Sequence, residues 1–114
     1  MTDLEKRQRS MCERFGAVFS PPEPGSRLGI GLQTLGQVPL HGVRHLPVAG
    51  TCGWYVWAGD WSDDPDFYTA LCVEHLPDHL VQALDLLALP PGWRFLMDNK
   101  GYLDVWFDEE AVRA

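Results

Sequence analysis

The sequence predicts a single α+β domain over residues 1–114, with a mainly antiparallel sheet of about five strands and two helices packed on it. The chain opens with a capped segment typical of an amphipathic helix. Short aromatic and β-branched runs then follow one another, and a hairpin signal joins the last two. Short turns favour antiparallel neighbours over the long crossovers of a doubly wound fold. A chain of 114 residues has the usual size of one domain.

The first helix has recognisable start and stop signals. Thr2-x-x-Glu5 is a capping box, in which each side chain satisfies a free backbone amide at the helix start. Apolar residues recur after it at helical spacing, and Gly16 offers the left-handed conformation that often ends a helix. These signals predict a helix from about Asp3 to Phe15.

The expected strands share short apolar runs bounded by Gly, Pro, Asn or Asp. They cover residues 27–34, a short piece around 42–45, and residues 52–58, 67–74, 93–97 and 103–107. Along residues 52–58, alternation should place Trp54 and Val56 on one face of the sheet and Tyr55 and Trp57 on the other. Asp98-Asn99-Lys100-Gly101 is the expected hairpin turn.

A second helix is expected between two proline-containing segments. Pro77 is tolerated in a first helical turn. Leu80, Ala83, Leu84 and Leu87 would then form one apolar stripe, and the helix should stop before Pro90-Pro91-Gly92. After residue 107 we expect one loose turn.

The net charge comes from one stretch of the chain. Between Arg44 and Arg94 there is no Lys or Arg, whereas seven carboxylates occur. They are Asp60, Asp63, Asp64, Asp66, Glu74, Asp78 and Asp85. The formal total is −7, so the other segments, with nine acids and nine bases, cancel. A pI near 4.8 argues against nucleic acid and anionic membrane surfaces as partners.

The chain has the features of a cytoplasmic protein. Its first residues are charged and contain no apolar run, so no signal peptide is expected. No run of eighteen apolar residues occurs, which argues against a membrane span. Cys12, Cys52 and Cys72 are odd in number and widely spaced, a pattern typical of reduced thiols.

Aromatic residues gather where the acidic stretch begins. Three of the five tryptophans lie between Trp54 and Trp61, and Trp61 sits on a predicted turn among aspartates. Aromatic anchors beside an acidic surface indicate a face that receives a basic protein. The predicted partner-binding residues are Trp57, Asp60, Trp61, Asp63, Asp64, Asp66, Glu74 and His75.

No metal or cofactor is expected. His75 and His79 are four residues apart, but Pro77 between them argues against a helical zinc pair. The acidic residues from Asp60 onward alternate like a calcium loop, yet the sixth position is Pro65 and the twelfth is Leu71.

No catalytic residue is predicted either. No Gly-x-Ser-x-Gly nucleophile motif occurs. Exposed aspartates would stay ionised and so could not act as a general acid. Cys72 lies in an apolar run, where a thiol is more often inert. The sequence therefore favours a binding protein over an enzyme.

Several motifs resemble one family of small bacterial proteins. They are Gly50-Thr51-x-Gly53-Trp54-Tyr55-x-Trp57, Asp63-Asp64-Pro65-Asp66-Phe67, Val73-Glu74-His75-Leu76, Leu89-Pro90-Pro91-Gly92-Trp93-Arg94-Phe95-Leu96 and Gly101-Tyr102-x-Asp104-Val105-Trp106-Phe107-Asp108. With them the chain resembles immunity family 33 of the polymorphic-toxin systems, over nearly its whole length. The resemblance implies a cytoplasmic antidote that binds a cognate toxin and blocks its active site. It carries over no catalytic residues.

Two other hypotheses remain open from the sequence. A small-ligand protein would use Trp57, Trp61, Tyr102 and His75 to hold a sugar or a nucleobase in an aromatic-lined cavity. A hydrolase would need His75 within hydrogen-bond reach of a carboxylate inside a cleft. The sequence leaves the identity of any toxin and the oligomeric state undecided.

Overall fold

The computed structural model describes residues 2–113 and, within them, holds one α-helix, six strands and four 3-10 helices. The α-helix α1 covers Asp3–Phe15, and the strands are β1 Arg27–Ile30, β2 Leu40–Arg44, β3 Thr51–Ala58, β4 Thr69–Cys72, β5 Trp93–Met97 and β6 Leu103–Phe107. The 3-10 helices are η1 Leu32–Thr34, η2 Val73–Asp78, η3 Val81–Leu86 and η4 Glu109–Val112.

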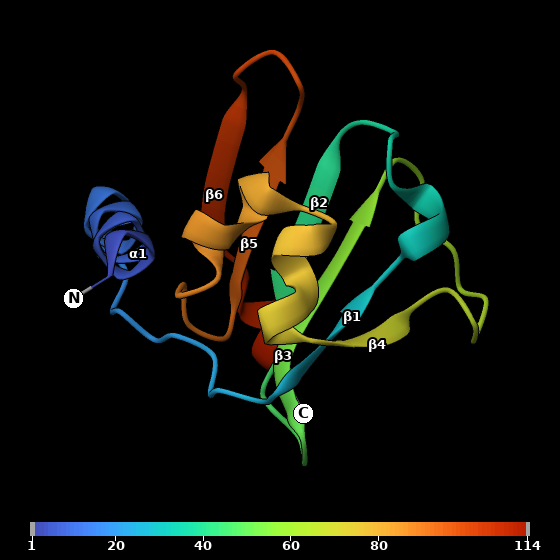
Figure 1. Cartoon of the computed structure of the whole chain (residues 1–114), viewed down its shortest axis with the longest axis horizontal. Helices are drawn as coiled ribbons and strands as arrows, with labels where there is room; N and C mark the ends of the chain where they lie inside the picture. Colours follow the sequence, from blue (N-terminus) through green and yellow to red (C-terminus); the bar gives the residue numbers. More distant parts are fainter. Residues whose placement is uncertain (1, 114) are drawn as a thin grey trace.

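All six strands form one mixed sheet in the order β4-β1-β3-β2-β5-β6 (Figure 1). Four neighbouring pairs are antiparallel, and β1 runs parallel to β3. The α+β class and the mainly antiparallel sheet are therefore confirmed. The sheet has six strands rather than about five.

The first helix follows its sequence signals. The Thr2 hydroxyl accepts the Glu5 amide at 3.0 Å, and Gly16 ends the helix with a φ of 73°. The helix is anchored to η3 and the turn after it, because the Gln8 side chain donates to the Leu84 carbonyl at 3.0 Å and the Cys12 thiol donates to the Ala88 carbonyl at 3.4 Å. The prediction of a helix over Asp3–Phe15 is confirmed.

The prediction of a second α-helix is wrong. Residues 73–86 contain η2 and η3, two short 3-10 helices separated by His79 and Leu80. Pro77 lies inside η2, where it has no amide to donate and so cannot support a regular α-helix. Residues 86–89 are all buried, so the segment lacks the single apolar stripe of an amphipathic helix.

Two strands are shorter than predicted. The strand expected over residues 27–34 ends at Ile30, and η1 follows. The strand expected over residues 67–74 is limited to Thr69–Cys72. Phe67 instead joins a small apolar cluster on the sheet.

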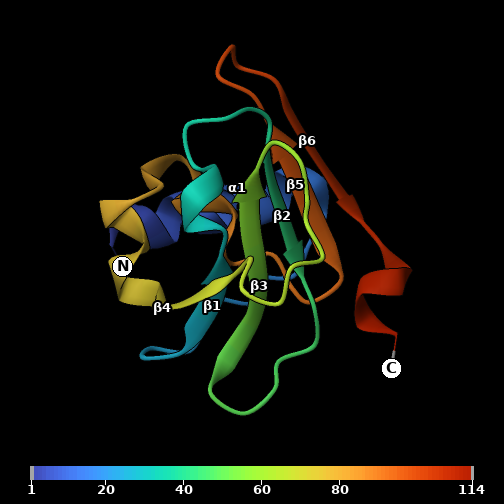
Figure 2. The ribbon, with the colours of Figure 1, turned by 90° about the vertical axis from the view of Figure 1, so that its right-hand side faces the viewer.

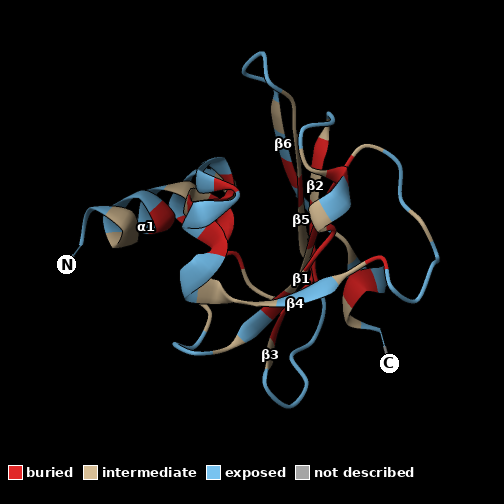
Figure 3. Cartoon of the chain, turned by 45° about the vertical axis from the view of Figure 1, so that its right-hand side comes forward, coloured by how far each residue is buried: buried red, intermediate tan, exposed pale blue. Residues whose placement is uncertain are grey.

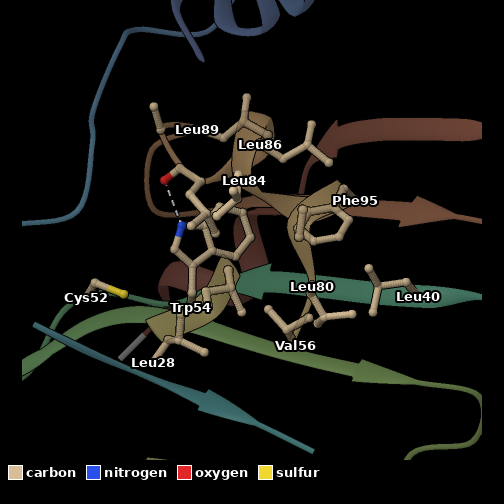
Figure 4. Close-up of a cluster of buried hydrophobic side chains, with 14 of the residues drawn as sticks. Leu28, Leu40, Cys52, Trp54, Val56, Leu80, Leu84, Leu86, Leu89 and Phe95 are labelled. Atoms are coloured by element: carbon tan, nitrogen blue, oxygen red, sulfur yellow. Dashed lines mark hydrogen bonds between the residues drawn. The ribbon is translucent and has the colours of Figure 1, made fainter. Parts of the chain in front are cut away.

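The helical layer covers only one face of the sheet. In Figure 3, α1 and the 3-10 helices η2 and η3 lie on one side, whereas the 59–68 loop and the C-terminal turn lie on the other. Trp54 and Val56 point into the covered core, where the Trp54 indole donates to the Leu87 carbonyl at 2.9 Å (Figure 4). Tyr55 and Trp57 belong to the cluster on the open face, which confirms the predicted alternation along β3.

Two glycines of the sheet lie where a side chain would not fit. Gly42 on β2 lies under the Phe95 ring of β5, and a Cβ atom at this position would overlap that ring. Gly53 on β3 has a φ of 92° and lies against the His45 carbonyl, so a side chain there would be strained and would clash.

Arg44 is a buried cation at the end of β2. Its side chain donates to the carbonyls of Cys52 at 2.9 Å, Ser20 at 2.6 Å and Leu89 at 2.8 Å, and its residue is 4% exposed. The guanidinium also lies 5.9 Å from the centre of the Trp54 ring. Arg44 thus joins the loop after α1, strand β3 and the turn before β5.

We predict that Arg44→Met lowers the free energy of unfolding by at least about 3 kcal/mol, because three carbonyls, two of them buried, lose their donor. Urea denaturation measures the change. Arg27→Met, at an exposed position on β1, is the matched control and should stay within about 0.5 kcal/mol. A loss below about 1 kcal/mol in Arg44→Met would contradict the role assigned to this residue.

Candidate functional site

The open face of the sheet carries a hollow of about 540 Å³. Its floor comes from β2 and β3, and its walls come from the 59–68 loop, β5 and the C-terminal turn. Figure 2 shows the loop lying in front of the sheet on this side. We call this space the open-face hollow; its lining includes His45, Tyr55, Trp57, Trp61, Tyr68, Arg94, Asp108 and Glu110.

One wall of the open-face hollow is aromatic. The Tyr68 ring meets the Tyr55 ring edge-on at 4.9 Å and the Trp57 ring at 6.2 Å. Burial raises the pKa of the Tyr68 hydroxyl, and hydrogen bonding with Trp61 opposes that rise. The phenol therefore stays protonated and uncharged near neutral pH.

His41 supports this wall from the neighbouring strand. Its ring stacks on the Trp57 indole with 4.9 Å between the centroids and 13° between the planes. Burial lowers the pKa of His41, a hydrogen bond with the Gly59 backbone opposes the change, and the charge of Arg94 adds to it. The uncharged imidazole is therefore favoured in the folded protein.

The opposite wall is polar. Arg94 pairs with Asp108 at 3.0 Å, and this hydrogen bond lowers the pKa of the Asp108 carboxyl. His45 Nδ1 lies 2.8 Å from the Ala111 carbonyl. Because a carbonyl only accepts, His45 Nδ1 carries the hydrogen.

Two side chains that line the open-face hollow each carry an unpaired donor. Among residues 2–113, the buried side-chain nitrogens without a hydrogen-bond partner are Trp57 Nε1 and Arg94 Nε. Trp57 is 6% exposed, so solvent does not replace the missing acceptor. Both residues line the same hollow.

The acidic loop, residues 60–66, rises beside the hollow. Two local hydrogen bonds hold its backbone. The Asp66 amide donates to the Asp64 carboxylate at 2.9 Å, and the Asp64 amide donates to the Ser62 hydroxyl at 3.1 Å. Trp61 is 59% exposed and lines the hollow. The ion pairs within residues 2–113 involve none of the four aspartates of the loop, Asp60, Asp63, Asp64 and Asp66.

The structure separates the predicted partner-binding residues into two groups. Trp57 and Trp61 line the open-face hollow, and the four aspartates lie on the loop that carries Trp61. Glu74 and His75 follow the other end of β4, on η2. The Glu74 carboxylate accepts the Gly25 amide at 3.0 Å, which is a structural role. His75 is exposed.

The same separation bears on the two alternative hypotheses. An aromatic hollow exists, but Tyr55 and Tyr68 accompany Trp57 and Trp61 in it rather than Tyr102 and His75. None of the ion pairs within residues 2–113 involves His75, so the structure does not place this ring beside a carboxylate in a cleft, as a hydrolase requires.

Within residues 2–113, no group of three or more His, Cys, Asp or Glu side chains is placed to hold a metal ion. The same residues contain no helix with both the length and the apolar character needed to cross a membrane.

Several residues of the hollow were not among those predicted from the sequence. Tyr55 had a usable signal, because alternation along β3 places it on the same face as Trp57. Arg94 and Asp108 had none, since their position beside Tyr55 depends on strand pairing across β2 and β5. Tyr68 was expected inside a strand.

Comparison with known proteins identifies a family. A family model, the Imm33-like domain, matches residues 7–108. No curated protein and no solved structure matches the chain. The matched range contains the acidic loop and both walls of the open-face hollow up to Asp108.

We predict that His41 makes the stability of the fold depend on pH. Because its pKa is lowered in the folded state, the unfolded chain binds the proton first as pH falls. Stability is then lost as pH drops through the unfolded value of about 6.5 and levels off below the folded pKa. His41→Phe keeps a ring on Trp57 and should lose less stability than the wild type between about pH 7.5 and 5.5.

Urea midpoints at both pH values measure this effect. His79→Gln, at an exposed position, is the control and should keep the wild-type pH dependence. Equal pH dependence in His41→Phe and the wild type would contradict the assignment.

Proposed function

Because the chain belongs to the Imm33-like family, we propose that it is an immunity protein that neutralises a cognate bacterial toxin by binding it. The proposal is of a non-enzymatic protein that uses no cofactor and acts in the cytoplasm. Its three free cysteines are compatible with a reducing compartment. The toxin would be inhibited because a bound protein covers its active site.

The proposed contact surface combines the acidic loop with the rim of the open-face hollow. The observation that supports it most directly is Trp61, an exposed indole among four aspartates without ion pairs. A large aromatic side chain beside a cavity is a frequent energetic centre of protein interfaces. The unpaired carboxylates would favour a basic partner.

The two parts of this surface would act at different stages of binding. Long-range attraction to the four aspartates accelerates the encounter and weakens as salt is added. Burial of the Trp61 indole, in contrast, slows dissociation and depends little on salt. The charges would therefore set the association rate, and the indole would set the lifetime of the complex.

The first test uses the product of the neighbouring gene as the candidate toxin. Trp61→Ala should weaken the complex at least about thirtyfold, mainly through faster dissociation, because an interface anchor contributes about 2 kcal/mol or more. Surface plasmon resonance measures both rate constants. Tyr102→Ala is the matched control, since Tyr102 is 53% exposed and does not line the hollow.

Growth assays complete this test. Co-expression of the chain should rescue cells that produce the toxin, and Trp61→Ala should rescue them less well than Tyr102→Ala. If no complex forms and co-expression rescues nothing, the proposed function is wrong. If a complex forms but tolerates Trp61→Ala, the contact surface lies elsewhere.

A second test separates local charge from net charge. The double variant Asp63→Asn/Asp66→Asn should lower the association rate constant by roughly threefold to tenfold at low salt. Asp3→Asn/Glu13→Gln removes the same number of charges from α1 and should have a smaller effect. The difference between the two variants should vanish at about 1 M salt. Equal effects at low salt would contradict a role for this loop.

A further inference from the structure

Two side chains that line the open-face hollow each carry a buried hydrogen-bond donor without an acceptor. A buried donor without a partner costs roughly 1–3 kcal/mol, so such groups are uncommon in folded proteins and require an explanation. Within residues 2–113 the two instances, Trp57 Nε1 and Arg94 Nε, belong to side chains that line one hollow. Both nitrogens are covered by neighbouring protein atoms in this structure, so a ligand reaches them only when the covering side chains shift. An acceptor brought in this way would satisfy them.

The shape and lining of the hollow favour a planar ring. Tyr55, Trp57, Trp61 and Tyr68 surround it with π-faces and edges. Its volume of about 540 Å³ lies within the range of small-molecule sites. Aromatic walls of this kind hold planar heterocycles by stacking.

The charges around the hollow favour an uncharged ligand. Arg94 is neutralised by Asp108 at 3.0 Å, and Glu110 is neutralised by Arg113 at 2.8 Å. The acidic loop beside the hollow would repel a phosphate group. These features favour a base or a nucleoside over a nucleotide.

We propose that the open-face hollow binds an uncharged planar heterocycle with a ring carbonyl, such as a nucleobase or its nucleoside. The carbonyl oxygen accepts from Trp57 Nε1 and Arg94 Nε, and the ring stacks within the aromatic wall. Trp61, the most exposed element of that wall, moves with its loop to admit the ring. This site shares Trp61 with the proposed toxin-binding surface. It does not rest on toxin binding, and either function can stand without the other.

Nuclear magnetic resonance tests the site without a toxin. The ¹⁵N-labelled chain is titrated with inosine, which carries a ring carbonyl, and with adenosine, which has nearly the same shape and lacks it. The indole and Arg Nε–H signals are assigned with Trp→Phe and Arg→Lys variants. We expect saturable shifts of the Trp57 Nε1–H and Arg94 Nε–H signals with inosine, with a dissociation constant of about 1 mM or tighter.

The chain provides an internal control. Trp54 Nε1 already donates to the Leu87 carbonyl at 2.9 Å, so its signal should stay in place. Inosine should bind at least about tenfold more tightly than adenosine, because adenosine brings no carbonyl to the two donors. Trp57→Phe keeps a ring but loses the donor and should weaken inosine binding by a similar factor, whereas Trp93→Phe should not.

Three outcomes would overturn the proposal. Inosine, uridine and cytidine could all fail to shift the Trp57 signal. Inosine and adenosine could bind equally well. The Trp61 signal alone could move, which would mean that bases stack at the rim without reaching the donors.

Discussion

The fold depends on a buried cation that has carbonyl oxygens, rather than a carboxylate, as its partners. The Arg44 side chain donates hydrogen bonds to backbone carbonyls of the segments around it. Without this donor, those carbonyls would lack a hydrogen-bond partner inside the fold. Its guanidinium also lies near the Trp54 indole, and that indole donates to the Leu87 carbonyl. Two side chains thereby bind an irregular segment, residues 86–89, to the centre of the sheet. Regular secondary structure is not needed there, since side chains provide the missing hydrogen bonds.

This arrangement leaves the two faces of the sheet unequal. The helical layer and its leucines pack against one face and form the main core with it. The other face has only a loop and a short C-terminal turn to cover it, and four buried residues form its small cluster. A concave space results because these two covers do not meet over β3. The features of interest for binding, an exposed indole, unpaired carboxylates and unpaired donors, all occur on this less covered face.

Local signals predicted the local structure well. The helix Asp3–Phe15 and the hairpin strands 93–97 and 103–107 were predicted with their observed bounds, because caps and turn residues act over a few positions. The parallel pairing of β1 with β3 could not be predicted in this way, since alternation along a strand says nothing about its neighbour. The open-face hollow was missed for the same reason. Its polar wall joins His45, Arg94 and Asp108, which only the completed sheet brings together.

Gly42 and Phe95 illustrate how far one contact constrains the chain. The ring occupies the volume that any side chain on β2 would need at this point, and it is itself buried in the core. Neither residue can therefore be replaced by a larger one unless the other changes too. A relative that acquires alanine at the first position must also acquire a smaller residue at the second, so the two positions form a compensating pair whose joint variation would report the register of β2 against β5.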